Sequence, residues 1–177
     1  GLARAAPGRG RGGYPPPAGA SPILGLEMAG VVSGLGAGVT QWAVGERVCA
    51  LLPGGGYAEQ VVVPQELAIR LPDDWSFAQG AAVPEVWLTA YVNLFMHGDL
   101  KAGETVLLHA GASGVGTAAI QLARAVGATV YVTAGSEDKL AFCRSLGTSL
   151  AINRKTDDFA AQILAQSDGV DVIIDPV

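Results

Sequence analysis

The sequence has very few of the side chains that build metal centres and disulfide frameworks. Its 177 residues include two cysteines, Cys49 and Cys143, and two histidines, His97 and His109. A zinc centre needs three or four Cys, His or carboxylate ligands close together, and a disulfide framework needs several spaced cysteines. Neither metal nor disulfides are therefore expected. Each cysteine is expected to be a small buried apolar residue. The low cysteine content fits a reducing, cytoplasmic compartment.

Charged and aromatic residues are also scarce, at 15% and 6% of the chain, and the formal net charge is −5. Nucleic-acid-binding domains carry clustered positive charge, so nucleic acid is not expected as the main partner. Half of the residues are hydrophobic, which is enough to bury a core. The length suits one sizeable domain or two small ones.

Residues 106–123 contain no Lys, Arg, Asp or Glu, so their hydropathy alone would mark them as a membrane span. Gly, Ser, Thr and Gln interrupt this run, however, and it breaks at a glycine turn. A strand followed by a buried helix explains the pattern better. No other segment looks membrane-spanning, and no membrane partner is expected.

The same region predicts a strand over 105–110, a glycine turn, and a helix over 114–126 whose apolar residues recur at helical spacing. In a dinucleotide-binding βαβ unit, such a turn and helix N-terminus approach a pyrophosphate. Counted from Gly111, the turn departs from the G-x-G-x-x-G fingerprint, because Ser113 stands in place of the middle glycine, whereas Gly114, Gly116 and Ala119 fit G-x-G-x-x-A literally. We prefer Gly111, because the turn then follows the strand directly. The candidate cofactor-binding residues of the turn are Gly111, Ala112, Ser113, Gly114, Val115 and Gly116.

Two patterns of secondary structure follow one another along the chain. Residues 24–72 are expected to form an antiparallel β module, because short strand-like runs alternate with turns. Its strands are predicted over 29–35, 47–52, 57–63 and 67–71. Helices are then expected over 77–82, with Ser76 as N-cap, and from Pro84 through Leu94.

From Thr105 onward, strands alternate with helices, which predicts an α/β unit with a parallel sheet. The strands are predicted over 105–110, 129–133, 149–153 and 170–175, and the helices over 114–126, 136–145 and 157–166. A β module followed by a nucleotide-binding module also predicts a ligand cleft between the two.

Five ordered stretches resemble the medium-chain dehydrogenase/reductase superfamily, and more closely its zeta-crystallin-like quinone oxidoreductases. They are ILGLEMAGVV (23–32), VGERVCALLPGGGYAEQVVVP (44–64), AAVPEVWLTAY (81–91), HAGASGVGTAAIQLAR (109–124) and VTAGSEDKL (132–140). The resemblance implies an α/β plus β fold. We expect a disordered or non-family segment over 1–12, and the resemblance implies a partial GroES-like substrate module over 13–80 and a partial Rossmann NADPH-binding module over 81–177.

The same resemblance implies metal-free hydride transfer from NADPH to a quinone or related enone, and a homodimer in the full-length form. The chain is expected to be a fragment, because the family's opening strands, its Asn near the nicotinamide and its later Rossmann strands have no counterpart here. Two alternatives stay open. One is a reductase of enoyl thioesters from the same superfamily, and the other is a truncated, non-catalytic chain that binds nucleotide.

The end of the second predicted Rossmann strand favours NADPH over NADH. An NAD enzyme places Asp or Glu there to bind the ribose 2′-hydroxyl, whereas this chain has Ala134 and Gly135. Gly135 and Ser136 offer N–H and hydroxyl donors at a helix start. The counter-evidence is Glu137, whose carboxylate could reach a ribose hydroxyl.

Two cations are candidates for the 2′-phosphate. The resemblance assigns this role to Lys139, and Arg154 stands where family members often have Tyr after Asn. The guanidinium of Arg154 could bind the phosphate as well as the phenol of a tyrosine does, or better. The alternative is that both side chains are solvated surface charges.

The resemblance also implies two residues near the reacting groups, Thr89 beside the nicotinamide and Tyr14 at the substrate cleft. A helix hydroxyl bonded to a carbonyl and simple loop packing are the respective alternatives. Glu27 follows Gly25-Leu26 where zinc-dependent relatives carry Gly-His-Glu, so it is expected to be satisfied by backbone groups. His109 is expected to be a hydrogen-bonded structural residue.

Overall fold

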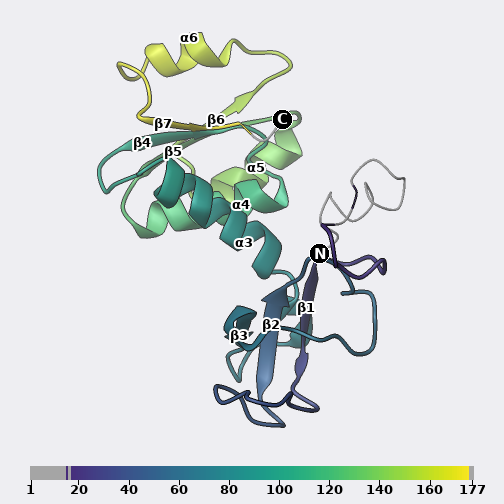
Figure 1. The fold of residues 1–177 in the computed structure, drawn as a ribbon. Coiled ribbons are helices and arrows are strands. Elements are labelled where there is room, and N and C mark those ends of the chain that lie inside the picture. Colours follow the sequence, from purple (N-terminus) through teal and green to yellow (C-terminus); the bar gives the residue numbers. More distant parts are fainter. Residues whose placement is uncertain (1–14, 16, 176–177) are drawn as a thin grey trace. The chain divides into compact units, whose positions relative to one another are not determined.

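The computed structural model describes residue 15 and residues 17–175. The predictions for Tyr14 and for residues 1–12 lie outside this described part. The chain divides into two compact units, Gly1–Glu85 and Val86–Val177. The first contains an antiparallel sheet and the second a parallel sheet with helices (Figure 1). The predicted fold class, a β-rich module followed by an α/β module, is confirmed.

The first unit is built on three antiparallel strands in the order β1-β2-β3. These are β1 (Glu27–Val31), β2 (Arg47–Leu51) and β3 (Ala68–Arg70), and a short 3-10 turn, η1 (Gln65–Leu67), precedes β3. Cys49 on the central strand lies opposite Ala29 on β1 and opposite Ile69 on β3. It is buried between its neighbours, as predicted.

A short helix, α2 (Phe77–Gly80), packs on this sheet. The Ser76 hydroxyl accepts the N–H of Gln79 (3.2 Å), and the Gln79 side chain accepts the N–H of Ser76 (2.8 Å). This capping box satisfies two helix-terminal donors and confirms Ser76 as the N-cap. A Cβ on Gly80 would lie 2.6 Å from Leu71 Cδ1, so only glycine allows the helix to approach the sheet this closely.

The strand predicted over residues 57–63 is wrong. These residues form bends and irregular backbone, and residues 58–63 make no hydrogen bond within the described part of the chain. They border a cavity of about 690 Å³ whose other side includes β1. An alternating sequence becomes a strand only where a neighbour accepts its backbone hydrogen bonds, and no described strand pairs with this segment.

The helix predicted from Pro84 through Leu94 begins as α3 (Pro84–Tyr91) and continues as a π-helical segment, η2 (Val92–His97). The N–H of Gly98 donates to the carbonyl of Asn93 (2.9 Å), the i to i−5 bond of a π-helix. Leu94, in this segment, is completely buried. The prediction is therefore correct in position but not in helix type beyond Tyr91.

The second unit contains a four-stranded parallel sheet in the order β6-β5-β4-β7. Its strands are β4 (Thr105–Leu108), β5 (Thr129–Ala134), β6 (Leu150–Asn153) and β7 (Val172–Ile174). The helices between them are α4 (Gly114–Ala125), α5 (Glu137–Ser145) and α6 (Phe159–Leu164). All seven elements were predicted, with ends that differ by a few residues. From β4 the strand order runs through β5 to β6, whereas β7 pairs with the other side of β4. The strand order therefore reverses at β4, and ligands of such sheets bind at this topological switch point.

Successive side chains of the strands point to opposite faces of the sheet and pack into two hydrophobic cores. Val106 and Val132 face the layer that contains α3 and α4, whereas Leu107, Tyr131 and Ile152 face Ile163 of α6. Figure 1 shows α6 on one side of the sheet and α3 and α4 on the other. Because both faces are covered, the strands are nearly continuous hydrophobic runs.

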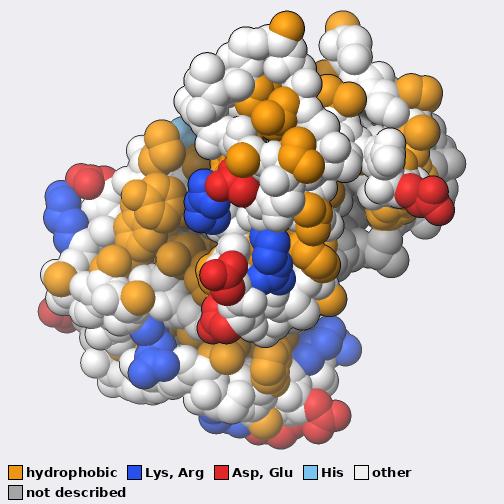
Figure 2. All heavy atoms as spheres, turned by 90° about the horizontal axis from the view of Figure 1, so that it is seen from below, with side chains coloured by type: hydrophobic (Ala, Val, Ile, Leu, Met, Phe, Trp, Pro, Cys, Tyr) orange, Lys and Arg blue, Asp and Glu red, His pale blue; other side chains and the backbone are white. Residues whose placement is uncertain are grey.

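The uncharged run over 106–123 divides into β4, a turn and α4, as predicted. Within the described residues, no helix has the length and apolar character needed to cross a bilayer. On the face drawn in Figure 2, Lys and Arg side chains are interspersed with Asp and Glu and with orange apolar areas.

Candidate nucleotide-binding site

The turn between β4 and α4 is fixed by its backbone. The N–H of Gly111 donates to the carbonyl of Thr133 (3.0 Å), and the N–H of Ser113 donates to that of Ala110 (2.8 Å). Ala110 has a positive φ of 52°, an uncommon backbone conformation for alanine that tends to occur at functional turns. The turn follows β4 directly, as the register from Gly111 requires.

Two glycines of the turn are required by close approach. A Cβ on Gly111 would lie 2.8 Å from Val132 Cβ, and one on Gly116 would lie 2.5 Å from the carbonyl oxygen of Gly111. Helix α4 therefore starts directly against the end of β4. This arrangement lets a ligand approach the turn backbone without obstruction by side chains.

Helix α4 presents free donors at its N-terminus. Ser113 is the N-cap, and its hydroxyl accepts the N–H of Gly116 (3.1 Å). The N–H groups of Ala112, Gly114 and Val115 have no acceptor among the described residues. With the helix dipole, these donors make a favourable site for an anion.

A pocket of about 230 Å³ lies beside this turn. Its lining residues come from three places along the chain: Ala110, Ala112, Ser113, Ala134, Gly135, Lys139, Arg154 and Lys155. Five of the predicted cofactor-binding residues thus meet at one pocket, namely Ala112, Ser113, Gly135, Lys139 and Arg154. They converge because β4, β5 and β6 are parallel neighbours and end at the same edge of the sheet.

The pocket lining contains cations and no carboxylate. Lys139, Arg154 and Lys155 are exposed, and none of the three forms an ion pair within the described chain. Glu137, the residue that could have reached a ribose hydroxyl, instead binds Arg144 on its own helix. Its carboxylate does not line the pocket.

The remaining predicted residues have other surroundings. Gly111, Gly114, Val115 and Gly116 form the turn and the first residues of α4 but do not line the pocket. Ser136 is the exposed N-cap of α5, and its side chain makes no capping hydrogen bond. Thr89 lies half-buried on α3, where its carbonyl accepts a hydrogen bond from the Asn93 side chain (2.8 Å).

Lys155 was missed at the sequence level. Lysines are common on protein surfaces, and Lys155 follows the strand predicted over 149–153, so no role at the pocket was predicted for it. The only available signal was Asn153, a residue type that forms tight turns through its side chain.

The residues present do not fit a zinc centre. No group of three His, Cys, Asp or Glu side chains converges in the part of the chain that the structure describes. The Glu27 carboxylate accepts the N–H of Glu85 (3.0 Å), so backbone satisfies it as predicted. Burial raises the pKa of both the Cys49 and Cys143 thiols, which disfavours the thiolate that zinc requires.

His109 has the structural role expected of it. Its Nδ1 lies 2.9 Å from the Thr133 hydroxyl, and its ring meets that of Phe159 edge to face. Both contacts tie the end of β4 to its neighbours.

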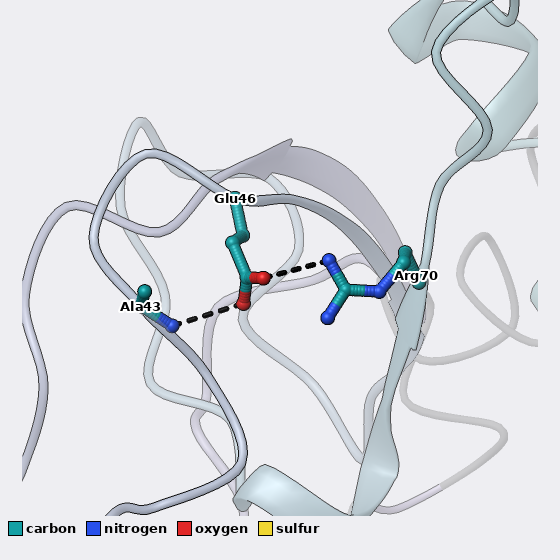
Figure 3. A network of polar contacts seen from close by, with 3 residues as sticks. All are labelled: Ala43, Glu46 and Arg70. Atoms are coloured by element: carbon teal, nitrogen blue, oxygen red, sulfur yellow. Dashed lines mark hydrogen bonds and ion pairs between the residues drawn. The ribbon is translucent and has the colours of Figure 1, made fainter.

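A polar network in the first unit fixes the loop before β2 (Figure 3). Glu46 accepts the N–H of Ala43 (2.9 Å) and pairs with Arg70 on β3 (2.7 Å). These two contacts, the Ala43 bond first, lower the pKa of the Glu46 carboxyl. The Arg70 guanidinium also lies over the Trp42 ring. The network joins backbone and side chains that all belong to this fold, so its role is structural.

Comparisons with known proteins match both parts of the chain. Residues 8–73 match the family described as alcohol dehydrogenase GroES-like domain, and residues 114–177 match zinc-binding dehydrogenase. A curated relative is the phenolphthiocerol synthesis polyketide synthase type I Pks15/1 of Mycobacterium bovis, with 46% identity over 168 residues. The match covers 93% of this chain but 8% of that protein.

Solved structures show the same architecture. The CurK enoyl reductase is 38% identical with a TM-score of 0.83, over 88% of this chain and 47% of that one. The Escherichia coli quinone oxidoreductase complexed with NADPH is 33% identical with a TM-score of 0.85, over 96% and 52%. The chain spans about half of these solved chains and 8% of the Mycobacterium bovis polyketide synthase.

Proposed function

We propose that this chain, whose residues 8–73 and 114–177 match the alcohol dehydrogenase GroES-like domain and zinc-binding dehydrogenase families, is a medium-chain dehydrogenase/reductase that binds NADPH and serves in reduction of an enoyl thioester. The observation that carries the coenzyme assignment is the pocket at the ends of β5 and β6. Three cations surround it and no carboxylate does. A ribose 2′-phosphate fits such a lining, whereas an NAD-specific site would need an acidic residue there.

The pyrophosphate would bind at the start of α4. The N–H groups of Ala112, Gly114 and Val115 are free to donate to it, and the helix dipole adds a favourable field. Ser113 holds this helix start in place through Gly116. The 2′-phosphate would then lie against Gly135 and Ser136, with Lys139 and Arg154 as its charged partners.

When bound, NADPH supplies a hydride to an electron-poor carbon. The protein then needs little acid–base machinery, because the cofactor carries the difficult chemistry. The chain's contribution is to bind and orient the cofactor and to exclude water. Thr89 near the nicotinamide and Tyr14 at the substrate remain our candidates for the reacting end of the site.

The enoyl thioester is favoured by two relatives. One is a polyketide synthase at 46% identity, and the other is an enoyl reductase at 38%. A double bond conjugated to a thioester carbonyl accepts hydride at its β-carbon and then a proton at its α-carbon. This chemistry requires no metal, in keeping with residues that do not fit zinc.

A quinone or free enone is the second candidate. It is supported by the quinone oxidoreductase complexed with NADPH, which matches 96% of this chain, and by the motifs over residues 109–124 and 132–140. Both substrate classes present an electron-poor carbon conjugated to a carbonyl group. The homodimer and the cytoplasmic location stay predictions.

Titration of the 177-residue chain with NADPH and NADH, followed by calorimetry or fluorescence, tests the coenzyme. We expect tighter binding of NADPH, and tighter binding of NADH would overturn the assignment. The substrate is tested by loss of NADPH absorbance with a crotonyl thioester and, in parallel, with a small quinone. Faster turnover of the thioester supports the proposal, and turnover of the quinone alone supports the second candidate. Binding without turnover of either would contradict a reductase activity for this chain.

A further inference from the structure

Lys155 reaches the pocket because a side chain bends the backbone after β6. The Asn153 side-chain oxygen accepts the N–H of Lys155 (3.1 Å), and the Asn153 carbonyl accepts the N–H groups of Thr156 (3.1 Å) and Asp157 (2.9 Å). This is an Asx turn, in which an Asn side chain replaces a backbone acceptor. Since β6 ends at Asn153, Arg154 and Lys155 belong to this turn and not to the strand, and both line the same pocket.

Both cations lie beside the residue expected to contact the 2′-phosphate. The position of a Cβ on Gly135 is 3.4 Å from Lys155 Cε and 3.7 Å from Arg154 Nε. Since Gly135 carries no side chain, its backbone and the two cations share one small volume. Lys139 of α5 lines this volume too.

The carboxylates next in sequence are engaged elsewhere. Asp157 accepts a hydrogen bond from the Thr156 hydroxyl (3.1 Å), and Asp158 caps α6 by accepting the N–H of Ala161 (3.1 Å). Neither lines the pocket. No described carboxylate forms an ion pair with Lys155, and an anion in the pocket would meet three cations.

We propose that Lys155 binds the 2′-phosphate of NADPH as a third cation and that Asn153 is the residue that positions it. The proposal rests on the proposed function, because it concerns the same coenzyme site. It makes coenzyme preference depend on the turn at 153–156 as well as on Lys139 and Arg154. A phosphate with two negative charges is held better by several charge-assisted hydrogen bonds than by one.

The test compares Lys155→Gln with Lys155→Arg and with the control Lys101→Gln, which removes the same charge from a lysine paired with Asp99. The probes are NADPH, NADH, 2′,5′-ADP and 5′-AMP. We expect Lys155→Gln to weaken NADPH and 2′,5′-ADP about tenfold, the effect of one charge-assisted contact. NADH and 5′-AMP should bind as before, because they lack the 2′-phosphate. Lys155→Arg and Lys101→Gln should retain the NADPH preference.

The positioning role is tested by Asn153→Ala and Asn153→Ser. Asn153→Ala should lose part of the NADPH preference. Asn153→Ser should retain more of it, because a serine hydroxyl can form the related turn. Adding Lys155→Gln to Asn153→Ala should reduce the NADPH preference little further. An unchanged ratio of NADPH to NADH affinity in Lys155→Gln would overturn the inference while leaving the proposed function intact. A wild-type chain that binds none of the four probes would overturn both.

Discussion

The Ser113 hydroxyl accepts a hydrogen bond from the N–H of Gly116, the third residue of helix α4. One of the orphan donors of the helix start is thereby satisfied inside the protein. The N–H groups of Gly114 and Val115 remain without an acceptor in the described chain. A single residue thus fixes the helix start and leaves its first two donors free for a phosphate.

The substitution Ser113→Ala should lower the free energy of unfolding of the second unit by about 1 kcal/mol, the usual cost of losing an N-cap. Ser113→Thr keeps a hydroxyl and should retain most of the stability. Chemical denaturation followed by circular dichroism measures both. Equal stability of the alanine variant and the wild type would show that the cap is dispensable.

The substitution Gly116→Ala should destabilise the protein although alanine is the better helix former. Helix propensity favours alanine by about 1 kcal/mol. The added Cβ, however, would lie 2.5 Å and 2.6 Å from the carbonyl oxygens of Gly111 and Ala110, and backbone cannot move aside cheaply. We expect a net loss of about 2 kcal/mol, measured by denaturation.

Gly34→Ala is the matched control, since a Cβ there meets nothing within 4 Å. It should be tolerated. A Gly116→Ala variant as stable as this control would contradict the close contact between α4 and the turn.

Coenzyme preference should respond to Arg154 but not to Glu137. Arg154→Gln removes a cation from the pocket lining and should weaken NADPH about tenfold relative to NADH. Glu137→Gln should leave the preference unchanged, because that carboxylate binds Arg144 and does not line the pocket. Titrations with both coenzymes measure this. Stronger NADPH binding after Glu137→Gln would mean that Glu137 faces the nucleotide.

Glu46 should make the stability depend on pH in the acid range. The Ala43 N–H and Arg70 lower the pKa of its carboxyl below the ordinary value of 4.5. The folded state therefore releases this proton more readily than the unfolded state, and the stabilisation is present above pH 4.5 and is lost as the pH falls through the lowered value. Thermal unfolding at a series of pH values should show a shallower acid decline for Glu46→Gln.

The control for this prediction is Glu59→Gln, which neutralises an exposed carboxylate of the same unit. Its acid decline should match that of the wild type. A decline that is equally steep in Glu46→Gln would show that the network of Figure 3 does not couple to folding.

Local pattern determined much of the fold in advance. The capping box at Ser76, the alternation of strands and helices after Thr105, and the glycine turn at Gly111 depend on neighbours in sequence. Hydrophobic periodicity and capping residues act within a few positions, so these features were readable. The burial of Cys49 and Cys143 and the backbone-bound carboxylate of Glu27 were predicted as well.

Only the tertiary structure decided the features that depend on distant partners. Residues 57–63 alternate as a strand does, but no described strand pairs with them. Glu137 could have faced the nucleotide, but Arg144 two turns along the helix binds it. Lys155 had the pattern of a surface lysine, but the Asx turn at Asn153 brings it to the pocket. The sequence by itself determines which residues can form a strand, a turn or a charged lining, because those choices are local. Which of them meet depends on parallel strands ending at one edge of a sheet, and that is decided by packing over the whole unit.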